Sequence, residues 1–183
     1  MKQFKGVLVL FLFVIGFSFG QVLSLEGDKS VSYIQYVIRH PLHTVKAINR
    51  EPKFTIEFDT KQRKILKAEA VAEVMKFNSG NSNRDSHAME AVEALKFPTI
   101  SFKSTEIDFS SEDIVVRGFL TFHGQTRKIE MKGKARFDGN NLFVDGNFKV
   151  SLTEFGVKRP SLLFIPVDDT LKIYIFAKFI LPE

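Results

Sequence analysis

The sequence predicts an all-β fold, an antiparallel barrel of about eight strands with one short inserted helix. Most segments after residue 20 alternate apolar and polar residues with a period of two, as half-buried strands do. Short, turn-like junctions such as residues 124–125 and 138–141 separate these segments, which favours antiparallel neighbours in up-and-down order. The period changes only after the polar stretch 78–83, where a helical spacing begins. A small closed barrel with an inserted helix is therefore expected.

The first residues have the pattern of a secretory signal. Two lysines precede an uncharged, mostly apolar run from Gly6 to Phe19, and small residues occupy the positions needed for cleavage after Gly20. The run is shorter than the roughly 20 residues that span a bilayer. No cysteine follows it for lipid attachment. We therefore expect residues 1–20 to be a signal peptide and residues 21–183 to form one exported domain, periplasmic or secreted.

Three strands are expected before the helix. Residues 33–38 form the first, which ends near Pro41 because proline lacks a donor for the strand ladder. Residues 53–59 alternate most regularly, and residues 65–75 keep period two despite their Ala and Glu content. The face of the second strand that we expect to point inward carries Phe54, Ile56 and Phe58.

The helix is expected from Arg84 to Leu95, with Asn83 as its N-cap. Met89, Val92 and Leu95 share one side at three-residue spacing, so this side is predicted to lie against the barrel. The dipeptide Phe97-Pro98 is expected to end the helix. The strands that we expect after it are residues 99–107, 113–123, 127–137, 141–153 and 170–181.

Composition excludes several classes of function. The chain has no cysteine, which removes disulfides, thiol catalysis and Cys-zinc sites. Loss of residues 1–20 would lower the formal net charge from +5 to +3, because that segment holds two lysines and no acidic residue. A mildly basic chain without an arginine-rich block or basic helix argues against dedicated nucleic-acid binding. The 20 phenylalanines could fill a barrel or line a cavity, and composition does not separate the two.

Four spaced segments resemble the signature segments of the YceI-like family: residues 77–87, 94–102, 118–127 and 152–169. This resemblance covers nearly everything after the leader. It implies a secreted or periplasmic, lipocalin-like antiparallel barrel that holds a long apolar molecule, typically an isoprenoid-type lipid. Family members often have a histidine at the position of His40, which we interpret as a group at the rim or mouth of the pocket.

The sequence thus leads to a binding hypothesis with no cofactor and no catalytic residue. Apolar strand faces would hold the tail of a polyprenyl compound, a quinone or a fatty-acid derivative, and polar rim groups would meet its head. The predicted rim residues are His40, Arg84 and His87. The predicted lining of the apolar tunnel is Phe54, Ile56, Phe58, Ile100, Phe102, Leu120, Phe122, Phe148, Val150 and Ile173.

Two other functions stay open at this point. One is an exported, stress-related interaction protein with a filled core and no ligand. The other is a hydrolase that uses Arg84, Asp85 and His87, although the chain has no nucleophile-elbow pattern such as G-x-S-x-G. The spacing of the four histidines sets up no metal site, and the adjacent carboxylates at residues 168–169 are expected in a turn.

Two apolar features remain outside the predicted tunnel. Residues 162–165 form an apolar run outside a regular strand, which is expected to close the tunnel, to pack on the core or to make transient membrane contact. Phe119, Tyr174, Phe176 and Ile180 lie on the opposite faces of their strands. These side chains are expected to pack under the helix or to form a homodimer surface.

Overall fold

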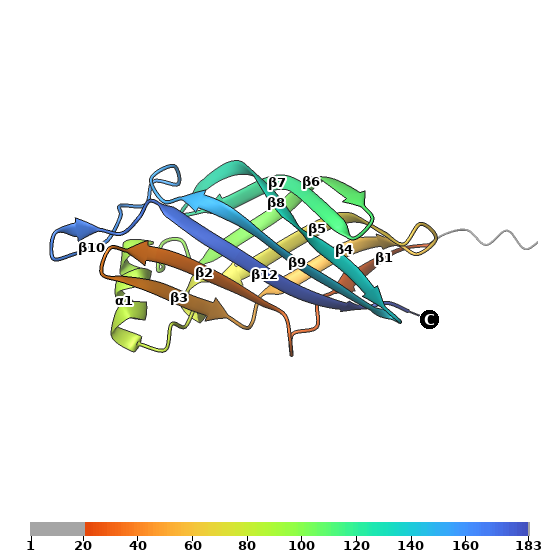
Figure 1. The fold of residues 1–183 in the computed structure, drawn as a ribbon, viewed down its shortest axis with the longest axis horizontal. Coiled ribbons are helices and arrows are strands. Elements are labelled where there is room, and N and C mark those ends of the chain that lie inside the picture. Colours follow the sequence, from red (N-terminus) through yellow and green to blue (C-terminus); the bar gives the residue numbers. More distant parts are fainter. Residues whose placement is uncertain (1–20, 183) are drawn as a thin grey trace, which may run out of the picture.

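Ten antiparallel strands form one sheet that curls around an apolar interior (Figure 1). The structure is a computed structural model that describes residues 21–182, so the predicted signal peptide lies outside the described residues. The order across the sheet is β1-β4-β5-β6-β7-β8-β9-β12-β2-β3. The strands are β1 (Val22–Glu26), β2 (Tyr33–His40), β3 (His43–Asn49), β4 (Lys53–Asp59), β5 (Lys64–Glu73), β6 (Thr99–Ser110), β7 (Asp113–Phe122), β8 (Gln125–Asp138), β9 (Asn141–Ser151) and β12 (Thr170–Ile180).

The predicted all-β barrel class is confirmed, and its main sheet has two strands that the sequence analysis did not predict. One of them, β1, directly follows the predicted signal peptide. The other, β3, places Val45, Ala47 and Asn49 on its buried side. An alanine and an asparagine at inward positions weaken the apolar alternation that marks a strand, which explains why β3 was missed.

The inserted helix differs in detail from the prediction. Helix α1 runs over Ser82–Ala91, and its N-cap is Asn81, whose side chain accepts a hydrogen bond from the backbone N–H of Arg84 at 3.0 Å. A short 3₁₀ turn, η1 (Val74–Lys76), ends the preceding strand. Val92 packs against the core, but Leu95 lies beyond the helix and is 92% exposed, so its predicted inward position was wrong.

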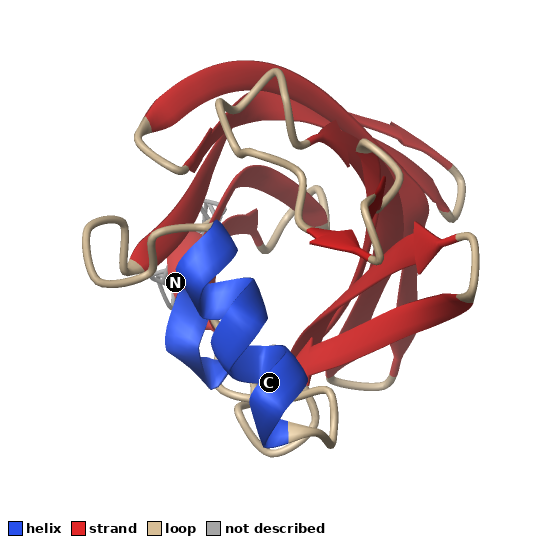
Figure 2. Cartoon of the chain, turned by 90° about the vertical axis from the view of Figure 1, so that its left-hand side faces the viewer, coloured by secondary structure: helices blue, strands red, loops and turns tan. Residues whose placement is uncertain are grey.

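One edge strand of the sheet, β3, is joined by hydrogen bonds to the segment that leads from β5 to α1. Ile48 in β3 exchanges two backbone hydrogen bonds of 3.0 Å with Asn78, just before α1. Asn49 is fully buried and donates from Nδ2 to the carbonyl of Glu73 at 3.0 Å. Figure 2 shows α1 lying at the same end of the curled sheet as several long loops. Hydrogen bonds rather than a continuous strand ladder therefore connect β3 to the segment that follows β5.

A long connection between β9 and β12, residues 152–169, is called the strap below. Its first part is buried through Leu152, Phe155 and Val157, and a two-stranded hairpin, β10 (Ser161–Leu162) and β11 (Ile165–Pro166), forms its far part. At its end Asp169 accepts hydrogen bonds from the Ser151 hydroxyl and from the N–H of Thr153. The hydrogen bond from Ser151, followed by those from Thr153, holds the pKa of Asp169 below its usual value against the opposing effect of burial.

Candidate functional site

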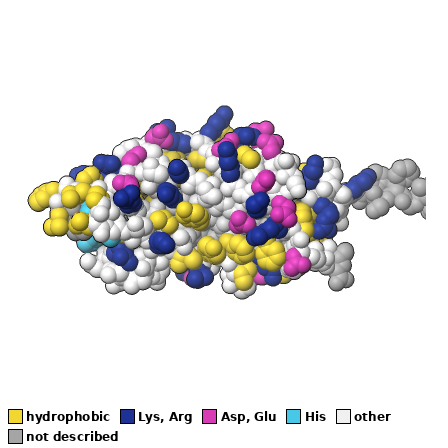
Figure 3. Space-filling view, in the orientation of Figure 1, with side chains coloured by type: hydrophobic (Ala, Val, Ile, Leu, Met, Phe, Trp, Pro, Cys, Tyr) yellow, Lys and Arg dark blue, Asp and Glu magenta, His cyan; other side chains and the backbone are white. Residues whose placement is uncertain are grey.

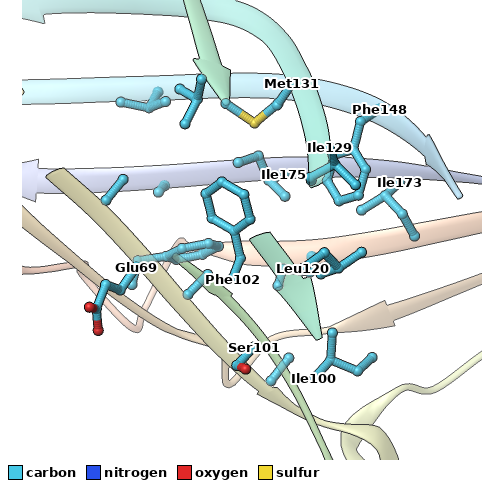
Figure 4. Close-up of a pocket in the computed structure, with 18 of the residues that line it drawn as sticks. Glu69, Ile100, Ser101, Phe102, Leu120, Ile129, Met131, Phe148, Ile173 and Ile175 are labelled. Carbon is cyan, nitrogen blue, oxygen red and sulfur yellow. The ribbon is translucent and has the colours of Figure 1, made fainter. Parts of the chain in front are cut away.

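An apolar cavity runs through the interior of the curled sheet (Figure 4). It has a volume of about 130 Å³. Inward side chains of most strands of the sheet form its wall. The lining consists of Ile34, Phe54, Ile56, Ile65, Ala68, Glu69, Ala70, Ala72, Phe77, Ile100, Ser101, Phe102, Ile107, Ile114, Val116, Leu120, Phe122, Ile129, Met131, Val144, Phe148, Val150, Leu171, Ile173, Ile175, Ala177 and Phe179.

The cavity is long and narrow. Every second residue of β12 from Leu171 to Phe179 contributes to its wall. Leu171 and Phe179 are eight residues apart, which corresponds to roughly 26 Å along the strand at about 3.3 Å per residue. A volume of about 130 Å³ spread along this length indicates a narrow space. The shape therefore suits a slender chain better than a bulky ring system.

Two phenylalanines stand at the middle of the cavity. The buried core divides into two clusters, one around Phe54, Ile114 and Phe179 and the other around Leu120 and Phe155. Phe102 and Phe148 pack against both clusters and are only partly buried. Because both side chains also line the cavity, the hollow explains why they keep exposed surface inside the fold.

Small residues on neighbouring strands leave open space beside these large rings. Ala68, Ala70 and Ala72 follow one another on the inward face of β5, where larger side chains would fill the cavity. On β7 the inward position 118 is glycine, and a Cβ there would lie 2.7 Å from the ring of Phe102. The ring thus occupies the space beside the backbone of β7.

The lining is almost free of polar side chains. Among the residues that line the cavity, Glu69 and Ser101 are the polar ones. The carboxylate of Glu69 is exposed and points away from the apolar side chains in Figure 4. A wall of this kind offers dispersion contacts and the hydrophobic effect, with few hydrogen bonds to fix a polar ligand.

Nine of the ten predicted tunnel residues line this cavity, and Phe58 does not. Phe58 faces inward as predicted, but it is 2% exposed in the core and its ring lies 6.2 Å from that of Phe137. Phe58 continues the inward column of Phe54 and Ile56 in β4, but it lies nearer the end of the strand, where it packs in the core beside Phe137 and not on the cavity. Contact of the nine residues with a ligand stays a prediction.

Sequence reasoning missed many members of the wall. Ile129 and Met131 alternate on β8, and Ala68, Ala70 and Ala72 lie in the segment 65–75 that was predicted to keep period two, but none of them was assigned to the tunnel. Period two was the signal that could have found them. Small side chains were passed over because a search for apolar contact favours large residues, although a cavity requires small ones.

His40 is part of the framework rather than of the cavity wall. Its ring is 2% exposed, its Nε2 lies 3.0 Å from the carbonyl oxygen of Ile165, and its Nδ1 lies 3.2 Å from the backbone nitrogen of Leu42. These partners fit a neutral ring that donates from Nε2 and accepts at Nδ1. His40 therefore connects the turn after β2 to the hairpin of the strap.

The other two predicted rim residues also lie off the cavity wall. Arg84 donates from Nε to the hydroxyl of Ser79 and from a terminal nitrogen to its carbonyl, both at 2.9 Å. Asp85 accepts the Ser79 N–H at 3.1 Å. His87 is exposed on α1. The polar motif thus orders the loop before the helix, and a head-group role for these residues stays a prediction.

Tyr36 lies close to this motif on the inner side of β2. Its ring centroid is 5.5 Å from that of Phe77, a cavity residue. Burial, with a smaller contribution from the negative charge of Asp85, raises the pKa of Tyr36 to about 12. The phenol is therefore neutral at ordinary pH and adds no charge beside the cavity.

Residues 21–182 contain neither a metal-ligand cluster nor a helix that could span a membrane. In that part of the chain, no three His, Asp or Glu side chains converge as ligands of a metal ion. The described helices are also too short or too polar to cross a bilayer.

The fold and cavity place the chain among small antiparallel barrels with an apolar interior. A family model for the YceI-like domain matches residues 26–179, and the chain belongs to this family. A UPF0312 protein of Vibrio cholerae serotype O1 is 31% identical over 117 residues, which cover 58% of this chain and 62% of that protein. The match thus spans less than two thirds of that relative.

Solved structures share the fold at low sequence identity. BcnA of Burkholderia cenocepacia superposes with a TM-score of 0.75 at 17% identity, covering 83% of this chain and 98% of that one. A polyisoprenoid binding domain from Saccharophagus degradans, implicated in plant cell wall breakdown, gives a TM-score of 0.66 at 11% identity and covers 88% and 100%. Likeness at such identities shows the fold alone.

Proposed function

We propose that the protein is an exported, non-enzymatic carrier that holds the apolar chain of one lipid inside the barrel. The observation that carries this proposal is the shape and chemistry of the cavity, which is narrow, about 130 Å³ in volume and lined by apolar side chains from one end of β12 to the other. Burial of each methylene of a ligand contributes about 0.8 kcal/mol, so a chain of several carbons gains substantial affinity without a hydrogen bond.

An isoprenoid chain is the ligand that this proposal favours. Its regularly spaced methyl groups would pack between the partly buried side chains of Phe102, Phe148 and Ile173, which already face the hollow. The solved structure of a polyisoprenoid binding domain with the same fold supports this choice. The head group, whether alcohol, phosphate or quinone, would stay near an end of the barrel because the wall offers it few partners.

Export is the second part of the proposal. The basic start and apolar run of residues 1–20 support it, and a chain without cysteine needs no disulfide to fold outside the cytoplasm. Sequencing the N-terminus of the protein from a fractionated host culture tests this part. Gln21 as the first residue of the extracytoplasmic protein is expected, and a full-length chain that stays in the cytoplasm would contradict export.

Ligand uptake is tested with farnesol and with a longer polyprenol as probes. Phe102→Asp places a carboxylate at the middle of the cavity and should abolish uptake, because an unpaired charge there is strongly disfavoured. The matched control is Phe119→Asp on the outer face of β7, where the ring is 41% exposed. A folded Phe102→Asp protein that takes up farnesol as well as the control would refute the placement of the ligand.

A further inference from the structure

An apolar tip projects from the strap at one end of the molecule. The tip consists of Leu163, Phe164 and Ile165, which are 71%, 101% and 41% exposed. In the space-filling view, hydrophobic side chains gather at the end where the hairpin of the strap lies (Figure 3). Phe164 thus loses none of its surface to the rest of the protein, although the same chain buries most of its large apolar side chains.

The backbone conformation of the tip is energetically unfavourable for the residue types that form it. Ser161 pairs with Pro166 across the hairpin, and the two-residue turn between its strands has positive φ at Leu163 (52°) and Phe164 (66°). Asn and Gly adopt this left-handed turn readily, whereas large side chains pay a steric penalty. The sequence therefore presents two bulky apolar side chains where small polar ones would fold more easily.

The tip is held in place by hydrogen bonds at its base. Nε2 of His40 donates to the carbonyl of Ile165 at 3.0 Å, and the N–H of Asp168 donates to the carbonyl of Arg39 at 2.7 Å. The N–H of Val167 also donates to the carbonyl of Pro160 at 2.9 Å. A fastened hairpin presents the tip at low conformational cost, because little order has to be created on binding.

The strap also connects the tip to the cavity. Phe155 and Val157 of the strap are 2% exposed and pack in the same cluster as Leu120, Phe122 and Val150, which line one end of the cavity. One side of the strap thus covers the cavity end, while its hairpin points the tip outward. Whatever binds the tip lies next to that end of the cavity.

The size of the tip favours a lipid surface over a protein partner. A stable protein interface buries about 1,200 Å² or more in total, which requires a broad patch with some 20 residues on each side. Three apolar side chains on a narrow projection do not form such a patch, but they suit insertion between lipid head groups. Lys158 and Arg159 precede the hairpin, and exposed Arg39 lies at its base. These cations can contact the head groups of an anionic bilayer, while Glu154 and Asp168, also exposed in the strap, carry the opposite charge.

We propose that the tip inserts into the surface of an anionic bilayer and brings the adjacent end of the cavity to the membrane, where the lipid chain enters or leaves. This inference rests on the proposed carrier function for its purpose, but the docking step is separate from ligand binding. Asp168 and Asp169 also lie in the strap, and Asp169 is engaged by Ser151 and Thr153.

The absence of tryptophan from the chain gives a direct test. The part of the chain from residue 21 onward contains the whole sheet and avoids the apolar leader. Phe164→Trp in this protein introduces a single fluorescent reporter at the tip, and Tyr174→Trp, on the outer face of β12, is the matched control. The probes are vesicles of phosphatidylglycerol with phosphatidylcholine, and of phosphatidylcholine alone.

We expect a blue shift and protection from an aqueous quencher for Phe164→Trp on anionic vesicles, with no change for Tyr174→Trp. Co-sedimentation of the protein with these vesicles should fall at least tenfold in Phe164→Ser with Leu163→Ser, and about fivefold for Lys158→Gln. An unshifted tip reporter, or serine variants that sediment like the parent protein, would overturn the docking proposal.

Farnesol binding in vesicle-free solution separates the two proposals. The serine variants should bind farnesol as the parent protein does, because the tip is not part of the cavity wall. Farnesol binding without vesicle binding would refute docking and leave the carrier function intact. Vesicle binding through the tip without any uptake of farnesol or a longer polyprenol would support docking and refute the carrier function.

Discussion

Ala70→Leu is expected to fill part of the cavity and to stabilise the protein in the absence of ligand. Ala70 lies on the inward face of β5, opposite Phe102 on one side and Phe54 on the other. The substitution adds three carbons, worth up to about 2.4 kcal/mol if all are buried without strain. The whole cavity of about 130 Å³ represents about 3 kcal/mol at roughly 24 cal/mol per Å³, so this gain lies within what the empty space allows.

The same substitution should weaken ligand binding. The added side chain occupies space that about three carbons of the ligand would fill, so the affinity for farnesol is expected to fall about 50-fold. Thermal unfolding measures both effects. Each kcal/mol raises the Tm of the ligand-free protein by about 2–4 °C, and the extra increase that farnesol produces should shrink.

Val71→Leu is the control, because the next side chain along β5 points outward and is 40% exposed. It should leave both the Tm and the effect of farnesol close to those of the parent protein. A filled interior gives the opposite result for Ala70→Leu, since overpacking costs about 1–3 kcal/mol. A lower Tm together with undiminished farnesol binding would therefore refute the cavity as the ligand site.

Three further predictions concern the framework. Asn49→Ala should lower the free energy of unfolding in urea by about 1–3 kcal/mol, because it leaves the carbonyl of Glu73 without its partner; exposed Asn147→Ala should change it little. The pKa of Tyr36 is raised from about 10 to about 12, so the folded state keeps the phenol proton to higher pH than the unfolded state does. Stability should therefore fall as pH rises between these two values. In Tyr36→Phe this part of the loss should vanish from the pH profile of stability. The pKa of Asp169 is lowered, so its contribution to folding stability is present above the ordinary pKa near 4 and is lost as pH falls below that value. Asp169→Asn should therefore make acid unfolding less steep. An unchanged acid-unfolding profile would contradict the role of the Ser151 hydrogen bond.

The strands that the sequence predicted well are those in which large apolar residues alternate without interruption. In β4 and β7 the inward positions carry Phe, Ile, Val or Leu, apart from Gly118, so period two was clear. In β3 the buried positions include Ala47 and Asn49. Asn49 is buried because its side chain donates a hydrogen bond to the carbonyl of Glu73 and so connects β3 to the end of β5. A tertiary role of this kind leaves no periodic signal along the chain.

The apolar wall of the cavity could be predicted from strand alternation, whereas a ligand contact of the polar residues stays a prediction. Residues on the inward face of regular strands met in the cavity, whereas Phe58, on the same face of β4, packs in the core beyond the cavity. His40, Arg84 and His87 were selected as polar residues near loops. The structure uses His40 and Arg84 to bind neighbouring carbonyls, and nothing in the spacing of a single sequence separates such bonds from ligand contacts.

Native mass spectrometry of the protein purified from its own host tests the central claim most directly, with extraction and identification of any released molecule. The carrier function predicts a stoichiometric adduct with a long apolar chain, present in Val71→Leu and depleted in Ala70→Leu. A clean ligand-free mass that persists after incubation with farnesol, longer polyprenols and quinones would contradict it.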